Sequence, residues 1–236
     1  MSDRTIIAYF HYNKSVTLTI FTSTISDGSM KTTNNDRETG RQNRIGYLKK
    51  VGLDPSATTL HTLGYETDNF CRYQILNTDD KGDGITRAST IIADAVIVTR
   101  SGHVVLFPLA DCIGAVIHDP VNNILMTSHL GRHNLEQQGG TRCIEFFIDK
   151  FGSSPSNLSV WFSPAAGGEN YPLYAFNNRS LQEVATEQLS AAGINTKNIT
   201  ASPIDVTTDG TYYSHSQFLK GNRDVDGRFC IVAVLN

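Results

Sequence analysis

The sequence has no surplus of basic residues and no long apolar run. Lysine and arginine number 20 against 23 acidic residues, which gives a net charge of −3. A dedicated nucleic-acid-binding protein usually carries a basic surplus on one face, so we expect no nucleic-acid partner. No stretch approaches the roughly 18 apolar residues of a membrane-spanning helix, so we expect no membrane partner.

Cysteines are few and widely spaced. Cys71, Cys112, Cys143 and Cys230 form no CxxC pair, which argues against a disulfide scaffold. The N-terminal segment lacks the apolar stretch of about 7 to 15 residues that marks a secretory signal. We therefore expect a cytoplasmic protein with reduced thiols.

The remaining composition is typical of a globular α/β protein. Of the 236 residues, 39% are apolar and 18% are charged, and no internal repeat or low-complexity linker divides the chain. One domain is expected over residues 1–236.

Short apolar runs separated by turn residues predict most of the strands, and helical spacing predicts three helices. Strands are expected near 16–20, 57–60, 91–98, 104–107, 114–118, 124–128, 158–162 and 229–235. Helices are expected over 36–50, from 139–141 to Gly152, and after a capping box of Ser180 and Glu183. Residues 26–35 predict a loop and 77–83 a surface insertion.

Two residues at the ends of predicted strands carry the strongest chemical signal. Cys112 closes the motif Leu-Ala-Asp-Cys, and His129 follows 17 residues later in Ser-His-Leu-Gly-Arg. Neighbouring strands of one sheet can bring two such positions together. Thiolate and imidazole are ligands that zinc prefers, and a catalytic zinc site keeps one position open for water.

A third ligand is less clearly indicated. His61, His103, His118 and His133 are candidates, and His61 has a slight advantage because it follows a predicted strand. The alternative is that no metal site exists, since a free cysteine is usually a small buried apolar residue.

Five motifs occur together in the order known from one protein family. From the N-terminus they are residues 43–55 (NRIGYLKKVGLDP), 95–112 (AVIVTRSGHVVLFPLADC), 129–132 (HLGR), 212–215 (YYSH) and 227–229 (GRF). On these motifs the sequence resembles the multicopper polyphenol oxidoreductase (laccase-domain) family, whose members are regarded as zinc-dependent purine nucleoside phosphorylases and in some cases as peptidoglycan-editing factors.

The resemblance implies a fold and a metal site. The fold would be two mixed β-sheets packed together and flanked by helices, in four layers. The zinc ligands would fall on Cys112, His129 and His61, with copper less suited to such a set. In the family the first histidine lies in a QxHG-like motif, whereas this chain reads Leu-His-Thr-Leu-Gly at 60–64.

The resemblance also implies an activity: adenosine or inosine and phosphate would give the free base and ribose 1-phosphate, with adenosine deamination as a further possibility. Asp111 and Arg132 are the expected catalytic residues. Asp111 would act as an acid/base or, as we favour, orient a ligand histidine. Arg44 is the first candidate for gripping phosphate and Arg132 the second. Gly139, Gly140 and Thr141 would add backbone N–H donors from a helix N-terminus.

Two segments depart from the family pattern and leave the substrate open. Residues 129–134 read HLGRHN in place of HaGwrG, and residues 163–174 depart from a GP-containing motif. A metal-free pair of Cys112 and His129 in a hydrolase or amidase for peptidoglycan editing is one alternative. A non-catalytic binding module of the same fold is another. The sequence makes no prediction of oligomeric state.

Overall fold

The last strand of the chain is apolar on both faces and buried along its whole length in the computed structural model. In β11 (Phe229–Leu235), Phe229 and Ile231 join one hydrophobic cluster, and Cys230 and Val232 join a second cluster. Because successive side chains of a strand point to opposite faces, β11 has to be covered from two sides. It therefore lies inside a multilayer structure.

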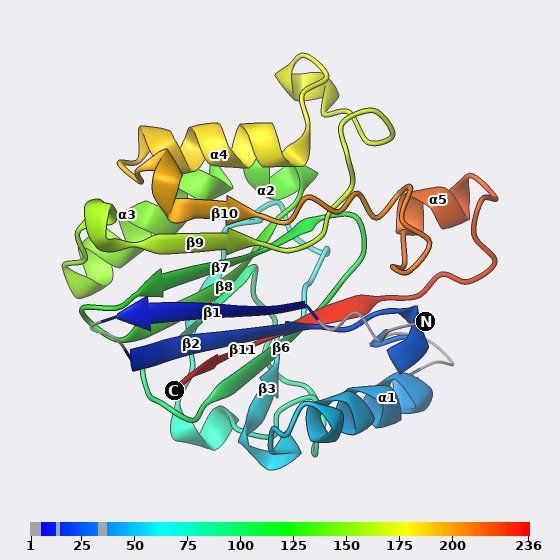
Figure 1. The fold of residues 1–236 in the computed structure, drawn as a ribbon, viewed down its shortest axis with the longest axis horizontal. Helices are drawn as coiled ribbons and strands as arrows, with labels where there is room; N and C mark the ends of the chain where they lie inside the picture. The colour runs from blue at the N-terminus through cyan, green and yellow to red at the C-terminus, as the bar shows by residue number, and fades with distance from the viewer. Residues whose placement is uncertain (1–5, 13–14, 33–36) are drawn as a thin grey trace.

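The structure describes residues 6–12, 15–32 and 37–236, and in them the strands form two mixed sheets packed face to face (Figure 1). The five-stranded sheet has the order β1 (Ile6–Tyr12), β2 (Ser15–Thr22), β11, β6 (Val104–Leu109) and β3 (Thr58–Leu60). The six-stranded sheet has the order β10 (Ile199–Ala201), β9 (Ser159–Phe162), β7 (Ile113–Asp119), β8 (Ile124–Leu130), β5 (Ala95–Val98) and β4 (Tyr73–Ile75).

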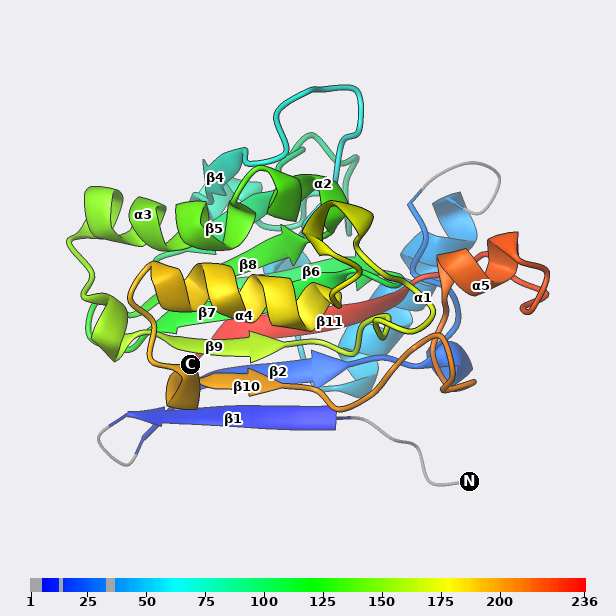
Figure 2. The same cartoon turned by 90° about the horizontal axis from the view of Figure 1, so that it is seen from above.

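Helices cover the outer faces of both sheets. Helix α1 (Arg37–Lys50) lies against the five-stranded sheet, with Tyr47 and Leu48 in the cluster that also contains Val232. Helices α2 (Arg132–Glu136), α3 (Gly139–Phe151) and α4 (Leu181–Ala191) lie over the six-stranded sheet, and α5 (His215–Leu219) lies at the same end of the molecule as α1 (Figures 1 and 2). This single-domain arrangement of two mixed sheets with flanking helices is the predicted fold class.

The predicted elements are found with some changes in length. The capping box of Ser180 and Glu183 begins α4, and Gly152 ends α3 with a positive φ of 65°, as predicted. The apolar run 91–98 contributes only Ala95–Val98 as a strand. The insertion 77–83 is not wholly on the surface, because Asp83 is fully buried and accepts hydrogen bonds from the Thr90 backbone and hydroxyl.

One predicted segment cannot be compared with the structure, and several observed elements are not predicted from the sequence. Residues 33–36, which include the end of the predicted loop and the predicted helix start at Asp36, lie outside the described residues. Strands β1, β4 and β10 and helices α2 and α5 are not predicted from the sequence. In the part of the chain that the structure describes, no helix has the length and hydropathy needed to cross a bilayer.

Candidate active site

Cys112 is presented by a tight turn where the chain passes from the five-stranded to the six-stranded sheet. The Cys112 N–H donates to the Ala110 carbonyl at 2.9 Å across Asp111, whose φ is +69°. A hydrogen bond between residues two apart around a positive φ defines a strained γ-turn. Such strain persists only where surrounding contacts hold it, and it is frequent at functional sites.

The carboxylate of Asp111 supplies those contacts. Asp111 is 3% exposed and accepts hydrogen bonds from the Ser214 hydroxyl at 2.5 Å and from the Ser216 N–H at 2.6 Å. In this structure both carboxylate oxygens bind the two serines, and no histidine ring is among their hydrogen-bond partners in the described residues. Asp111 instead ties the turn that carries Cys112 to the first turn of α5.

His129 lies opposite the start of β7, on the neighbouring strand β8. The register pairs Gly114 with His129. A Cβ built on Gly131 would lie 2.8 Å from His129 Nε2 and 2.9 Å from Cys112 Sγ. The two atoms therefore face the same point in space, as the positions of Cys112 and His129 at neighbouring strand ends predict.

We expect Gly131→Ala to destabilise the protein by about 1–3 kcal/mol, since the added methyl group would overlap both side chains. Urea unfolding measures this change. Gly46→Ala is the matched control: Gly46 lies inside α1 with no atom within 4 Å of its added Cβ, so alanine there should stabilise by about 0.5–1 kcal/mol. Equal effects of the two substitutions would contradict the proposed crowding at Gly131.

The environments of His129 and His61 differ. His129 is 9% exposed, and no group among the described residues hydrogen-bonds to its ring nitrogens. His61 is 1% exposed; its Nδ1 lies 3.0 Å from Thr127 Oγ1 and its Nε2 lies 3.1 Å from the Ala93 carbonyl. The carbonyl can only accept, so Nε2 donates and Nδ1 accepts from the hydroxyl.

His61 is therefore a core residue in this structure. Its ring stacks on Phe107 at 3.9 Å, and Phe107 in turn makes an edge contact with His129 at 6.2 Å. With both nitrogens engaged, His61 has no free donor to offer a metal shared by Cys112 and His129. The expectation that it completes the ligand set is corrected on this geometry.

The other residues do not complete a three-ligand centre either. No group of three or more histidine, cysteine or acidic side chains in the described parts of the chain could hold a metal ion. His103 and His118 do not line the cavity that contains Cys112. His133 lines that cavity, and its ring stacks on Phe70. Leu63 also lines this cavity. It directly precedes Gly64, so it stands at the position that the histidine of a QxHG motif occupies. The residues present therefore do not fit the expected zinc centre.

Cys112 and His129 lie in a cavity of about 510 Å³ with aromatic and cationic walls. Its lining includes the aromatic residues Tyr65, Phe70 and Tyr171, the arginines Arg132 and Arg228, and His215 of α5. Among these, only Arg132 is predicted as a site residue. His215 and Arg228 belong to the C-terminal motifs that carry the family resemblance, which is the signal that could have identified them.

The two arginines of this cavity differ in how firmly they are held. Arg228 donates to the Asp226 carboxylate at 2.6 Å, and His215 Nδ1 lies 2.8 Å from the same carboxylate. Burial acts to raise the pKa of Asp226, but the hydrogen bonds from Lys31, Arg228 and His215 outweigh it and hold that pKa well below its usual value. No described residue binds the Arg132 side chain, which is exposed and available to an anion.

Burial also keeps the central pair uncharged. It raises the pKa of the Cys112 thiol to about 12, assisted by the Asp111 carboxylate, and it lowers the pKa of His129 to about 4. At pH 7 the chain alone therefore presents a neutral thiol and a neutral imidazole.

The other predicted phosphate-binding residues lie elsewhere. Arg44 lines a different cavity. The Gly140 N–H donates to Gln188 Oε1 at 3.0 Å, and the Thr141 hydroxyl donates to the Gln188 carbonyl at 3.1 Å. A Cβ on Gly139 would overlap Asn134. The start of α3 is therefore packed against α2 and α4, and it does not line the cavity that contains Cys112 and His129.

Comparisons with known proteins agree with this fold. The chain is 18% identical to the YfiH hypothetical protein of Bacillus licheniformis, whose crystal structure superposes with a TM-score of 0.80 over 93% of each chain. It is 14% identical to YlmD of Geobacillus stearothermophilus, with a TM-score of 0.81 over 98% of this chain and 100% of the other. At these identities the likeness establishes the fold.

Sequence comparisons identify the family. The chain is 24% identical over 122 residues to the purine nucleoside phosphorylase YlmD of Bacillus subtilis (strain 168). That match spans 51% of this chain and 43% of the relative, which is less than half of the relative's length. The profile of a metal-associated family, the multi-copper polyphenol oxidoreductase laccases, matches residues 26–179. The chain belongs to the multi-copper polyphenol oxidoreductase laccase family.

Proposed function

We propose that the chain binds a purine nucleoside together with phosphate in the Cys112–His129 cavity and cleaves the nucleoside by phosphorolysis. One observation carries this proposal: aromatic walls, an arginine with no partner among the described side chains, and the Cys112–His129 pair share a single cavity. Its volume of about 510 Å³ lies within the range usual for small-molecule sites. The name of the Bacillus subtilis relative supports the same activity.

The aromatic residues would hold the purine base. Tyr65 is 64% exposed at the cavity, and Tyr171 lines it as well. Flat π surfaces stack on each other with a gain of about 0.5–1.5 kcal/mol beyond simple burial. Stacking depends little on the substituents of the ring, so the aromatic residues would select purine bases in general and not one particular purine.

Arg132 would hold the phosphate. A guanidinium binds phosphate through two parallel hydrogen bonds, and Arg132 has no competing partner among the described side chains. Arg228, oriented by Asp226, would add a second positive charge. In the reaction a phosphate oxygen bonds to C1′ of the ribose as the bond from C1′ to the base nitrogen breaks, and the base leaves with a proton.

The described residues of the cavity provide fewer metal donors than the expected three-ligand zinc centre needs. Cys112 and His129 supply two donors, and neither His61 nor Leu63 supplies a third. We therefore assign no step to zinc or copper. Adenosine deamination is proposed as an additional activity of the same cavity, and it would be detected by the ammonia that it releases.

A substrate screen tests the proposal. Adenosine, inosine, guanosine and methylthioadenosine are each incubated with the purified protein, with and without phosphate, and free base, ribose 1-phosphate and ammonia are measured. We expect at least one nucleoside to release its base only when phosphate is present. Absence of base release from all four would contradict phosphorolysis.

A non-catalytic purine-binding module is the second candidate, and the lack of a third metal donor among the described residues favours it. Isothermal titration calorimetry separates the two candidates, because a binding module would take up a nucleoside without releasing base or ammonia. Saturable binding with no product in the screen would support this second candidate.

A further inference from the structure

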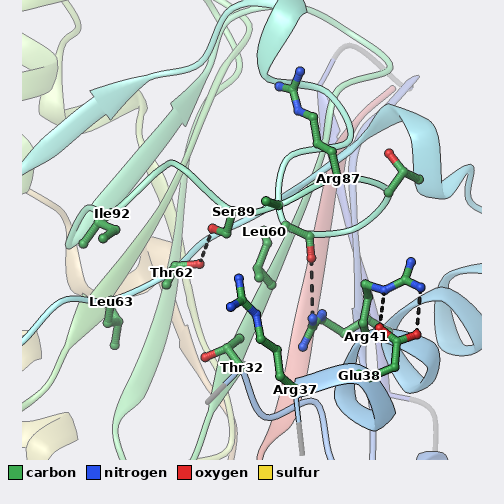
Figure 3. Close-up of a pocket in the computed structure, with 14 residues that line it drawn as sticks. Thr32, Arg37, Glu38, Arg41, Leu60, Thr62, Leu63, Arg87, Ser89 and Ile92 are labelled. Carbon is green, nitrogen blue, oxygen red and sulfur yellow. Dashed lines mark hydrogen bonds and ion pairs between the residues drawn. The ribbon is translucent and has the colours of Figure 1, made fainter. Parts of the chain in front are cut away.

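A second cavity, of about 610 Å³, lies between the N-terminal part of α1 and the loop 84–92 (Figure 3). Four arginines and one acidic residue are among its lining residues. Leu63 lines both this cavity and the one that contains Cys112, so the two are neighbours. We call it the arginine cavity.

Two of the four arginines are already neutralised or engaged. Arg41 donates from Nε and one terminal nitrogen to the Glu38 carboxylate, at 2.9 and 2.8 Å. Arg87 donates to the Asp79 backbone carbonyl. Figure 3 shows the Arg41–Glu38 pair at one side of the cavity.

Arg44 carries a buried charge that nothing in the described chain neutralises. It is 3% exposed and donates to the backbone carbonyls of Met30, Lys31 and Gly84 at 2.9, 3.0 and 3.5 Å. No carboxylate of the described residues lies within ion-pair distance, and its Nε is buried without a hydrogen-bond partner. Burial lowers the pKa of Arg44 only to about 10, so it is charged at pH 7. An unpaired buried charge and an unmet donor are both costly.

Arg37 adds a second unpaired charge. It opens α1, where the helix dipole already contributes a partial positive charge. Arg37 is exposed and has no partner among the described residues. Its side chain extends toward Thr62 and Leu60 across the cavity (Figure 3). The positive charge of Arg37 and the partial positive charge of the helix N-terminus repel each other, so a bound anion would be stabilising here.

We propose that the arginine cavity binds a phosphate monoester or diphosphate ester of a nucleoside or sugar. Arg37 would hold the phosphate oxygens, and Arg44 would contribute its buried positive charge. Thr62 and Ser89, whose hydroxyls lie 3.1 Å apart, would donate further hydrogen bonds. Leu63 and Ile92 give the cavity an apolar part for the uncharged end of the ligand. This site is independent of the function proposed for the Cys112–His129 cavity.

Calorimetric titration with ADP, AMP, ribose 5-phosphate, inorganic phosphate and uncharged adenosine tests the proposal. We expect at least one phosphate ester to bind more tightly than adenosine and to raise Tm. Arg37→Gln, which changes an exposed side chain, should weaken that binding at least about tenfold. Arg100→Gln, at an exposed arginine that lines neither cavity, should leave it unchanged.

Arg132→Gln separates the two cavities. If the phosphate ester binds in the arginine cavity, this variant retains the affinity whether or not the protein phosphorolyses nucleosides. Loss of binding in Arg132→Gln with retention in Arg37→Gln would place the ligand beside Cys112 and overturn the proposal. So would failure of all four phosphate compounds to bind, or tighter binding of inorganic phosphate than of every ester.

Discussion

His129→Ala is expected to lower kcat/KM for nucleoside phosphorolysis at least about 100-fold, the effect typical of losing a positioned catalytic imidazole. His129 lies at the cavity with both ring nitrogens unengaged among the described residues, and its Nε2 and Cys112 Sγ lie 2.8 and 2.9 Å from the same point, a Cβ built on Gly131. Its side chain makes one aromatic contact, with Phe107, so the fold should tolerate the change. Steady-state kinetics and thermal unfolding of the same preparation measure both effects.

His61→Gln is the matched control, because it changes a histidine that serves the core. Its loss of stacking on Phe107 and of the bond to Thr127 should lower the free energy of unfolding by about 1–3 kcal/mol. Turnover per folded molecule should remain close to that of the wild type. Full activity in His129→Ala, or lost activity with unchanged stability in His61→Gln, would reverse the roles given to the two residues.

The electrostatics of the cavity weigh against a metal-free cysteine hydrolase. A Cys–His nucleophile works as a thiolate beside an imidazolium. Here burial disfavours the charged form of each residue, which raises the pKa of Cys112 and lowers that of His129. The nearby Asp111 carboxylate opposes the thiolate further, because its negative charge repels a second one.

The pairing of Cys112 with His129 could be predicted because it is nearly local. Cys112 directly precedes β7, and His129 lies near the end of β8, the antiparallel neighbour to which a short turn leads. The buried strands could be predicted for the same reason. Strand β11 is apolar at every position, which is typical of a strand covered on both faces.

The positions of His61 and Arg44 could not be predicted, because they depend on contacts between elements far apart in sequence. His61 follows β3 at the edge of one sheet, and its ring direction is set by Phe107 on β6 and Thr127 on β8. Arg44 lies on a helix whose buried face turns it toward Met30 and Gly84. A motif gives the residue type at a position but not the partners that its side chain will find.

Leu63→His is expected to create a three-ligand metal site, which the described residues of the wild-type protein do not form. Leu63 lines the same cavity as Cys112 and His129, and a histidine there would be the third donor of a set that suits zinc. The wild-type protein should lose zinc on dialysis, whereas the variant should retain close to one ion per chain. Its zinc affinity should rise on the order of 100-fold, since metal affinity depends on the complete ligand set.

Elemental analysis and the absorption of a bound Co²⁺–thiolate measure this gain without any activity assay. Ile92→His is the matched control: Ile92 is 57% exposed and lines the arginine cavity only, so its histidine should not bring zinc to Cys112. One zinc per chain in the dialysed wild type would show that the chain completes its site in another way. Equal zinc in Leu63→His and Ile92→His would show that residue 63 does not reach the Cys112–His129 pair. A gain confined to Leu63→His would mean that one substitution separates this cavity from a three-ligand centre, because Cys112 and His129 already line the cavity and lie close to the same point.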